Sequence, residues 1–260
     1  MNTKTTSDAG SLKRGVALLK LLATAGRKGL ALTELAAKAQ LPHPSAHRVL
    51  AQLIAENLAV HDAQTRRYRL GALAFELGVA GSTMHDIRDL CDGAMGSLAQ
   101  ETGDTVYLVV RSGFDAVCMH RREGEFPIRA LVLEVGSRRP LGVGAGGLAI
   151  LSAIGEEERL EIIQRVTPNL SAFGKLTASD LDAACAQARA DGAAVIQNRV
   201  SLGVRAVGVA FRDSMGHAVG ALSVAALTQR LNQRRTQVII ELLRNATRDV
   251  EVRMRKRHTS

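Results

Sequence analysis

Apolar side chains recur at helical spacing in three stretches near the start of the chain. The first stretch ends at Gly26, and the second opens on Thr33, a residue type that often caps helices. The third follows Pro42 and Pro44, which suit a first helical turn because proline has a helical φ and its missing N–H is not needed there. The positions expected to face a core are Leu12, Val16, Leu19 and Leu22 in the first helix, with Leu18 and Leu21 broadening the apolar stripe, Leu35, Ala36 and Ala39 in the second, and Ala46, Val49, Leu50, Leu53 and Ile54 in the third.

The outward face of the third predicted helix is polar. Ser45, His47, Arg48 and Gln52 all carry hydrogen-bonding groups. In a DNA major groove, arginine can donate two hydrogen bonds to guanine O6 and N7, and glutamine can pair with adenine N6 and N7. An ordinary surface helix with a solvated face would have the same composition, so this helix alone does not establish DNA recognition.

A β-hairpin is predicted directly after these helices. The segment "LAVHDAQTRRYRL" favours two short strands around a turn at 62–65, and its second half carries Arg66, Arg67 and Arg69. Helix, turn, helix and a basic hairpin, in this order, are typical of a winged helix-turn-helix domain that binds double-stranded DNA. The residues expected to contact DNA are Lys38, His43, Ser45, His47, Arg48, Gln52, Arg66 and Arg67, with Lys38, Arg66 and Arg67 on phosphate groups.

The charge of the chain is concentrated in this first part. The 260 residues have a formal net charge of +9 and a pI of about 10.1. Residues 1–78 hold 11 basic and 5 acidic side chains, a net +6, so the remainder contributes only +3. A basic module joined to a nearly neutral second domain favours a polyanionic partner for the first part alone.

The pattern changes after residue 71. A proline-free stretch predicts a linker helix, and from 104 onward period-two apolar runs alternate with helical patterns. Strands are predicted at 105–111, 115–123, 128–136, 193–200, 204–212 and 218–227, and helices at 147–154, 156–166, 177–192 and 233–257, with Thr177 and Asp180 forming a capping box. An antiparallel sheet flanked by helices is an α+β domain, which is a suitable host for one small-molecule pocket.

Several functional classes find no support in the sequence. The three cysteines are widely spaced, which predicts buried thiols in a reducing, cytoplasmic compartment rather than a zinc site or a disulfide framework. The first residues are polar, and no apolar run approaches the roughly 20 residues that span a bilayer. The histidines do not cluster, and no catalytic motif is present, so we expect no metal, no cofactor and no enzymatic activity.

One alternative remains open, a nucleotide-cofactor-binding enzyme. The run "GVGAGG", Gly142–Gly147, fits the spacing G-x-G-x-x-G and is followed by a predicted helix. The apolar strand that should lead directly into the first glycine is interrupted by "GSRRPL", and Pro140 does not suit a central strand. A protein that coats DNA without specificity would also explain the charge, but it would leave the second domain without a role.

The motifs of the first part resemble the DNA-binding domain of the IclR family of bacterial transcription regulators. The resemblance rests on "SLKRGVALLKLLA", on "LPHPSAHRVL" with Leu41, Pro42, Ser45 and Arg48, and on "YRLG" at the end of the hairpin. His43 and Pro44 depart from the lysine and serine usual in the family, so the base preference does not carry over. The resemblance extends to about residue 250 and implies a homodimer, or a dimer of dimers, held together through the linker helix.

The second half is similar to the GAF-like effector-binding domain of that family. The resemblance rests on "LGVGAGGLAIL" and on "LGVRAVGVAFRDSMGHAVGALSVAAL". It implies a DNA-binding regulator controlled by a small organic acid. The implied domains are a disordered tail at 1–10, the winged helix-turn-helix at 11–71, a linker helix at 72–83, the GAF-like domain at 84–252 and a basic tail at 253–260.

The implied effector site departs from the family pattern in its polar residues. Its expected residues are Gly144, Ala145, Ile196, Ala206 and Ser223. Ile196 stands where the family has an aspartate, and Ala206 stands where it has a cysteine. Because an apolar lining favours a larger apolar body over a small hydrophilic acid, we expect an aromatic or otherwise apolar acid, with its carboxylate held by the Gly144 and Ala145 amides and the Ser223 hydroxyl.

Overall fold

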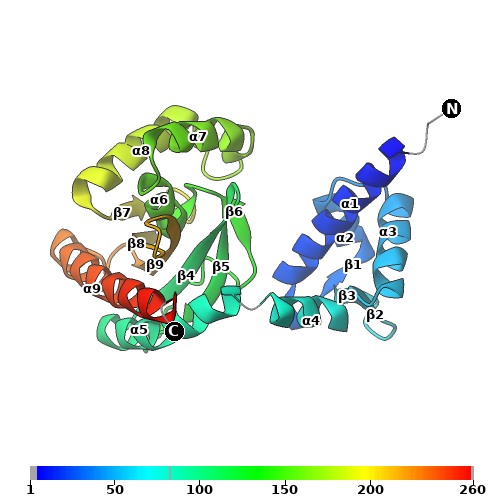
Figure 1. Ribbon diagram of the computed structural model, residues 1–260, viewed down its shortest axis with the longest axis horizontal. Coiled ribbons are helices and arrows are strands. Elements are labelled where there is room, and N and C mark those ends of the chain that lie inside the picture. The colour runs from blue at the N-terminus through cyan, green and yellow to red at the C-terminus, as the bar shows by residue number, and fades with distance from the viewer. Residues whose placement is uncertain (1–4, 82, 259–260) are drawn as a thin grey trace. The chain divides into compact units, whose positions relative to one another are not determined.

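The computed structural model describes residues 5–81 and 83–258, and it divides the chain between His85 and Asp86 into two compact units. Figure 1 labels the elements of each unit. Every helix in the described part of the chain is too short or too polar to cross a bilayer. The two units are described separately below.

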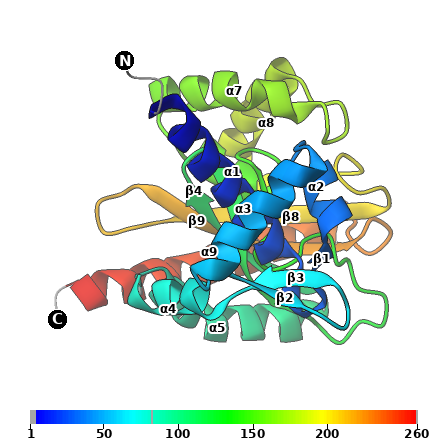
Figure 2. The same cartoon turned by 90° about the vertical axis from the view of Figure 1, so that its right-hand side faces the viewer.

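The first unit is a winged helix-turn-helix, as predicted. A three-stranded antiparallel sheet of order β1-β3-β2 closes against three helices. Figure 2 shows α3 beside α1, with the β2–β3 hairpin following at the end of α3. The elements are α1 Thr5–Thr24, the 3-10 turn η1 Gly26–Lys28, β1 Leu30–Ala31, α2 Leu32–Lys38, α3 His43–Ala55, β2 Ala59–Asp62, β3 Arg67–Leu70 and α4 Ala72–Ala80.

The core of this unit confirms one part of the predicted face of α1 and corrects another. Leu18 and Leu22 are buried, whereas Leu12 is 72% exposed and Val16 is 41% exposed. Gly15 is buried as well, where α1 approaches α3, and a Cβ there would lie 3.8 Å from side-chain atoms of α3. The inward face of α1 is therefore the one that carries Gly15, Leu18 and Leu22.

The start of α2 also differs from the prediction. Thr33 lies inside the helix and does not cap it, because α2 begins at Leu32 with Ala31 in the N-cap position. The cap is supplied by Glu34, whose carboxylate accepts a hydrogen bond of 2.8 Å from the Ala31 N–H. One orphan amide at the helix start is satisfied in this way.

Both predicted tails are partly helical. Helix α1 already begins at Thr5, so residues 5–10 do not form the disordered tail predicted at 1–10, while 1–4 lie outside the described residues. The last helix, α9, Gln233–His258, includes most of the predicted basic tail at 253–260; residues 259 and 260 lie outside the described part.

The second unit is an α+β domain built on one antiparallel sheet of order β6-β5-β4-β9-β8-β7. Helices α6 to α8 cover one face of the sheet, and α5 and α9 cover the other (Figure 1), each with its own buried apolar cluster. The elements are α5 Thr83–Thr102, β4 Thr105–Ser112, β5 Asp115–Arg122, β6 Arg138–Pro140, α6 Gly144–Ser152, α7 Glu156–Leu170, α8 Ala178–Asp191, β7 Ala194–Gln197, β8 Val204–Arg212 and β9 Ala218–Leu227. The predicted capping box of Thr177 and Asp180 opens α8.

The strand predicted at 128–136 is absent, and β6 at the sheet edge takes its place. The reason is that side chains satisfy the backbone groups of this segment. The Tyr107 hydroxyl donates a hydrogen bond of 2.6 Å to the Ala130 carbonyl and accepts one of 3.0 Å from the Val132 N–H. Pro140, the last residue of β6, is tolerated because it lies in an edge strand.

All three cysteines are buried free thiols, as predicted. Burial raises the pKa of Cys91 to about 12 and the pKa of both Cys118 and Cys185 to about 11. A thiol with a raised pKa forms little thiolate, the nucleophilic form, at neutral pH. These cysteines are therefore packing residues.

An ion-pair cluster joins α5 to β5 and predicts a specific acid sensitivity. The Asp92 carboxylate accepts hydrogen bonds of 2.9 and 2.6 Å from Arg122 and lies 2.7 Å from His120 Nε2. The Arg122 and His120 hydrogen bonds lower the pKa of Asp92 to about 2. The carboxylate thus stabilises the fold fully above its ordinary pKa of 3.8, and this stabilisation is lost as the pH falls toward 2.

We expect Asp92→Asn to flatten the fall in unfolding free energy between about pH 4 and pH 2. The change is modest, because the side chain is half exposed and solvent screens its ion pairs. Urea unfolding at several pH values, for both proteins, measures this slope. An Asp92→Asn variant that loses stability as steeply as the parent over this interval contradicts the assignment.

Candidate functional site

The polar face predicted for α3 is present. Helix α3 begins at His43. Pro42 is its N-cap residue, and Pro44 is the second residue of the helix. Ala46, Val49 and Leu50 are buried, which turns the opposite side of the helix outward. On that side His43, His47, Arg48 and Gln52 are exposed and Ser45 is half buried.

The wing is organised by an aspartate. Asp62 Oδ1 accepts hydrogen bonds of 3.0 Å from both the Gln64 and the Thr65 amides, which shapes the turn between β2 and β3. The backbone hydrogen bond from Thr65 is the main cause that lowers the pKa of Asp62. Arg66 follows with a left-handed φ of 54° and an exposed side chain. Lys38, in the last turn of α2, is also exposed.

The other two wing arginines are engaged within the domain. Arg67 Nη1 donates a hydrogen bond of 2.9 Å to the Gly29 carbonyl and lies 3.4 Å from the Glu34 carboxylate. Arg69 Nη2 lies 3.4 Å from Asp62 Oδ2. The Arg67 contacts hold the wing against the rest of the first unit, and the Arg69 contact holds its two strands together. Counting basic residues in the sequence did not reveal these roles.

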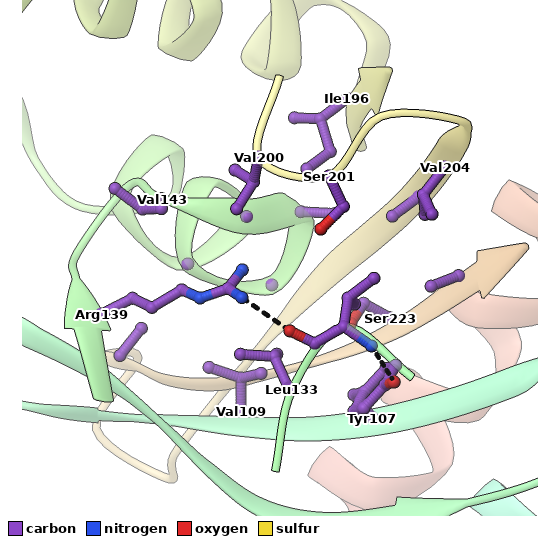
Figure 3. Close-up of a pocket in the computed structure, with 18 of the residues that line it drawn as sticks. Tyr107, Val109, Leu133, Arg139, Val143, Ile196, Val200, Ser201, Val204 and Ser223 are labelled. Carbon is purple, nitrogen blue, oxygen red and sulfur yellow. Dashed lines mark hydrogen bonds between the residues drawn. The ribbon is translucent and has the colours of Figure 1, made fainter. Parts of the chain in front are cut away.

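The second unit contains a pocket between α6 and the sheet (Figure 3). All five residues predicted for the effector site line it: Gly144, Ala145, Ile196, Ala206 and Ser223. The walls are mainly apolar, with Val109, Leu133, Val143, Val200 and Val204 among them.

Two kinds of hydrogen-bond donor meet at one side of the pocket. Helix α6 begins at Gly144 without a side-chain cap, so the first-turn amides have no partner within the helix. Ser223 on β9 is only 5% exposed, and no hydrogen bond of its hydroxyl is found within the described part of the chain. A Cβ built on Gly146 would lie 3.5 Å from Ser223 Oγ, so serine and helix start are adjacent.

Sequence reasoning missed several polar residues of the pocket, among them Tyr107 and Arg139. The Tyr107 hydroxyl holds the backbone of Val132, and Arg139 Nη2 donates a hydrogen bond of 2.6 Å to the Val132 carbonyl (Figure 3). Burial raises the pKa of Tyr107 and lowers the pKa of Arg139. Successive side chains of a strand point to opposite faces of the sheet. Arg138 pairs with Asp115, so Arg139 faces the other way, toward the pocket.

The comparisons with known proteins identify the family. Residues 80–252 match the model of the bacterial transcriptional regulator IclR C-terminal domain, and residues 11–63 match the IclR helix-turn-helix domain. The chain belongs to the IclR family of bacterial transcription regulators. Its domains were thus placed in the right family by the motifs of the sequence.

Named relatives cover nearly the whole chain. The transcriptional repressor AllR of Escherichia coli K12 is 28% identical over 93% of this chain and 89% of its own length. An IclR transcriptional regulator from Alicyclobacillus acidocaldarius superposes with a TM-score of 0.73 at 22% identity, over 94% and 98% of the two chains. An IclR homologue from Microbacterium hydrocarbonoxydans, solved with 4-hydroxybenzoate, gives a TM-score of 0.72 at 23% identity, over 95% and 99%.

The enzyme alternative is not supported in this IclR-family chain. The strand before Gly142 is β6, a short antiparallel edge strand, whereas a dinucleotide-binding turn follows a parallel strand. The glycines serve packing, because a Cβ on Gly146 would lie 2.9 Å from the Val109 side chain and one on Gly147 would lie 3.2 Å from Ala116. The described residues also contain no group of three metal-ligating side chains.

Proposed function

We propose that this IclR-family chain regulates transcription in the cytoplasm by binding operator DNA through α3 and the wing. The observation that carries the proposal is the divided surface of α3, with Ala46 and Leu50 buried and Arg48 and Gln52 exposed. Such a helix can enter a major groove without disturbing its own core. His43, Ser45 and His47 share the proposed base-contacting face, and Lys38, Arg66 and Arg67 are proposed to meet phosphate.

Replacing Arg48 and replacing Arg66 are expected to weaken DNA binding in different ways. If Arg48 binds one guanine through two hydrogen bonds, Arg48→Ala costs about 1–3 kcal/mol and relaxes the preference at one base pair. Arg66, on the wing, is expected to contact phosphate, so Arg66→Ala weakens all sequences alike and reduces the salt slope by about one. Gel shifts on the upstream region of its own gene, at several salt concentrations, measure both.

Arg66 is a better choice for this test than Arg67, because the Arg67 guanidinium already contacts the Gly29 carbonyl and the Glu34 carboxylate. A loss at one specific base for Arg66→Ala, or a uniform loss for Arg48→Ala, contradicts the division of roles. A parent protein that ignores duplex DNA at low ionic strength contradicts the proposed function itself.

The second unit is proposed to bind a small organic acid with an apolar body as effector. Support comes from the largely apolar walls beside the Ser223 hydroxyl and the start of α6, and from the 4-hydroxybenzoate carried by the Microbacterium homologue. Calorimetry with aromatic and aliphatic acids tests this, and tight binding of glyoxylate-like acids alone contradicts the apolar-bodied class. The effector shifts DNA binding by no more than its differential affinity for the two states of the protein.

The chain is proposed to act as a homodimer or a dimer of dimers. Helix α4 buries none of its residues, and Phe75, Leu77 and Val79 are all exposed on it. An apolar helix surface of this kind is stabilised by burial against a second copy. Two copies would bind half-sites about 34–36 Å apart or multiples of that distance. Sedimentation analysis at micromolar concentration tests the dimer, and a monomer there contradicts it.

A further inference from the structure

The pocket of the second unit contains a positive charge without a carboxylate partner. Arg139 Nη2 is bonded to the Val132 carbonyl, and no carboxylate contributes to the shift in the pKa of Arg139, which burial lowers. None of the residues that line the pocket is acidic. The other arginine, Arg199, lies 3.7 Å from Asp180 and is half exposed.

The position of Arg139 is fixed before any ligand arrives. The Val132 carbonyl that accepts from Nη2 belongs to a peptide segment held by the Tyr107 hydroxyl, and Tyr107 is itself buried in β4. This chain of hydrogen bonds occupies only one edge of the guanidinium. Since arginine offers five N–H donors, the remaining ones are available to an anion. Figure 3 shows the guanidinium extending from β6 into the centre of the pocket.

The free edge of the guanidinium lies beside the start of α6. A Cβ built on Gly144 would lie 3.8 Å from Arg139 Nη1, which is the nitrogen not bonded to Val132. The first-turn amides of α6 and the Ser223 hydroxyl border the same space. A guanidinium, a helix N-terminus and a hydroxyl therefore converge where one carboxylate could accept hydrogen bonds from all three.

Arg139 is positively charged at neutral pH, as arginine always is in proteins. Holding this charge in a half-buried site is unfavourable unless an anion compensates for it. The Val132 carbonyl is a neutral acceptor and supplies hydrogen bonding without charge. A monoanionic ligand with an apolar body compensates for the positive charge of Arg139. Its carboxylate binds the guanidinium, and its apolar body packs against Val109, Val143 and Ile196.

We propose that Arg139 binds the carboxylate of the effector and selects monoanionic, apolar-bodied acids over their neutral analogues. This inference rests on the proposed effector function and adds a residue to it. The Gly144 and Ala145 amides and Ser223 then orient the carboxylate. Arg139 supplies the positive charge that distinguishes an acid from its neutral analogue. A neutral amide of the same shape fills the apolar part of the pocket but leaves the guanidinium uncompensated.

The test compares each acid with its amide. The probes are benzoate, 4-hydroxybenzoate and phenylacetate with their carboxamides, titrated calorimetrically into the full-length dimer or monomer as purified. The parent protein is expected to prefer at least one acid over its amide. Arg139→Gln is expected to weaken that acid about 10- to 100-fold and to leave the amide within about twofold, since a charged hydrogen bond is lost but the apolar contacts remain.

Two further variants keep the test decisive. Arg138→Gln removes the same charge from the same strand, but Arg138 bonds Asp115 and Ser112 instead of facing the pocket, so acid affinity should stay unchanged. If Arg139→Gln does not fold, Arg139→Lys keeps the charge without the two-pronged geometry and should retain the preference for acid at reduced affinity.

Unchanged acid affinity in folded Arg139→Gln, equal losses for acid and amide, or a parent that binds none of the acids overturns the role of Arg139. These results leave operator binding untouched. Gel shifts on the same preparations report separately on the proposed regulator, so a protein that discriminates acids through Arg139 but ignores duplex DNA would contradict the proposed function and not this inference.

Discussion

Leu50→Ala is expected to destabilise the first unit by about 2–5 kcal/mol and to abolish operator binding. Leu50 is fully buried in α3 and packs in the cluster that includes Leu18, Leu35 and Tyr68. Truncation leaves a cavity at the point where α3 rests on the rest of the domain. A small domain has a total stability of about 5–15 kcal/mol, so this loss populates states in which the polar face of α3 is no longer presented to DNA.

Thermal unfolding and gel shifts measure the two consequences of Leu50→Ala. Because Leu50 lies in the first unit, acid binding by the second unit should persist. Leu12→Ala is the matched control for stability, since it removes the same atoms from an exposed side chain of the same unit and should change the free energy of unfolding by less than about 0.5 kcal/mol. A Leu50→Ala protein that binds its operator as tightly as the parent would contradict the placement of α3 on this core.

The sequence predicted the first unit well where the spacing of apolar residues agreed with the residues that begin or end a helix. In α3 the two prolines mark the start, and Ala46, Val49 and Leu50 recur on one face, so helix, core face and polar face were all confirmed. Around α1 the apolar residues were frequent enough to define two overlapping faces. The face that packs on α3, with Gly15 at the contact, is fixed by tertiary packing, which the spacing of apolar residues does not reveal.

The segment 128–136 shows why a run of apolar residues does not suffice to predict a strand. Its residues have strand-like composition, but the Tyr107 hydroxyl satisfies both Ala130 and Val132, so no ladder forms there. This interaction joins residues more than twenty positions apart, so no periodic pattern in the sequence reveals it. The same interaction holds the acceptor of Arg139, which explains why that pocket residue was also missed.

The predicted effector residues were found together because the family resemblance placed them, and residue spacing alone could not have done so. Gly144 and Ala145 lie on α6, Ile196 on β7 and Ser223 on β9, and only the sheet order β9-β8-β7 brings the two strands under the helix. What the resemblance could not supply is the residue that distinguishes this chain. Arg139 lies on an edge strand next to a second arginine of different function.

Gly208→Ala is expected to disable the pocket while leaving the first unit intact. Gly208 lies on β8 beneath the first turn of α6, where a Cβ would lie 2.5 Å from the Ala145 carbonyl oxygen and 3.0 Å from the Gly146 nitrogen. These are backbone atoms, so relief requires α6 to shift off the sheet. Overpacking of this kind costs about 1–3 kcal/mol, and the amides of Gly144 and Ala145 move away from Ser223.

For Gly208→Ala we expect acid affinity to fall at least about tenfold, because hydrogen bonds to the carboxylate lose their geometry. Calorimetry measures the affinity, and operator binding without acid should be retained. Gly96→Ala is the matched control: it adds the same methyl group to α5, where no atom lies within 4 Å of the new Cβ, and it should leave acid affinity unchanged. Full acid affinity in Gly208→Ala would mean that the start of α6 does not hold the carboxylate, since that helix cannot keep its place above an added methyl group.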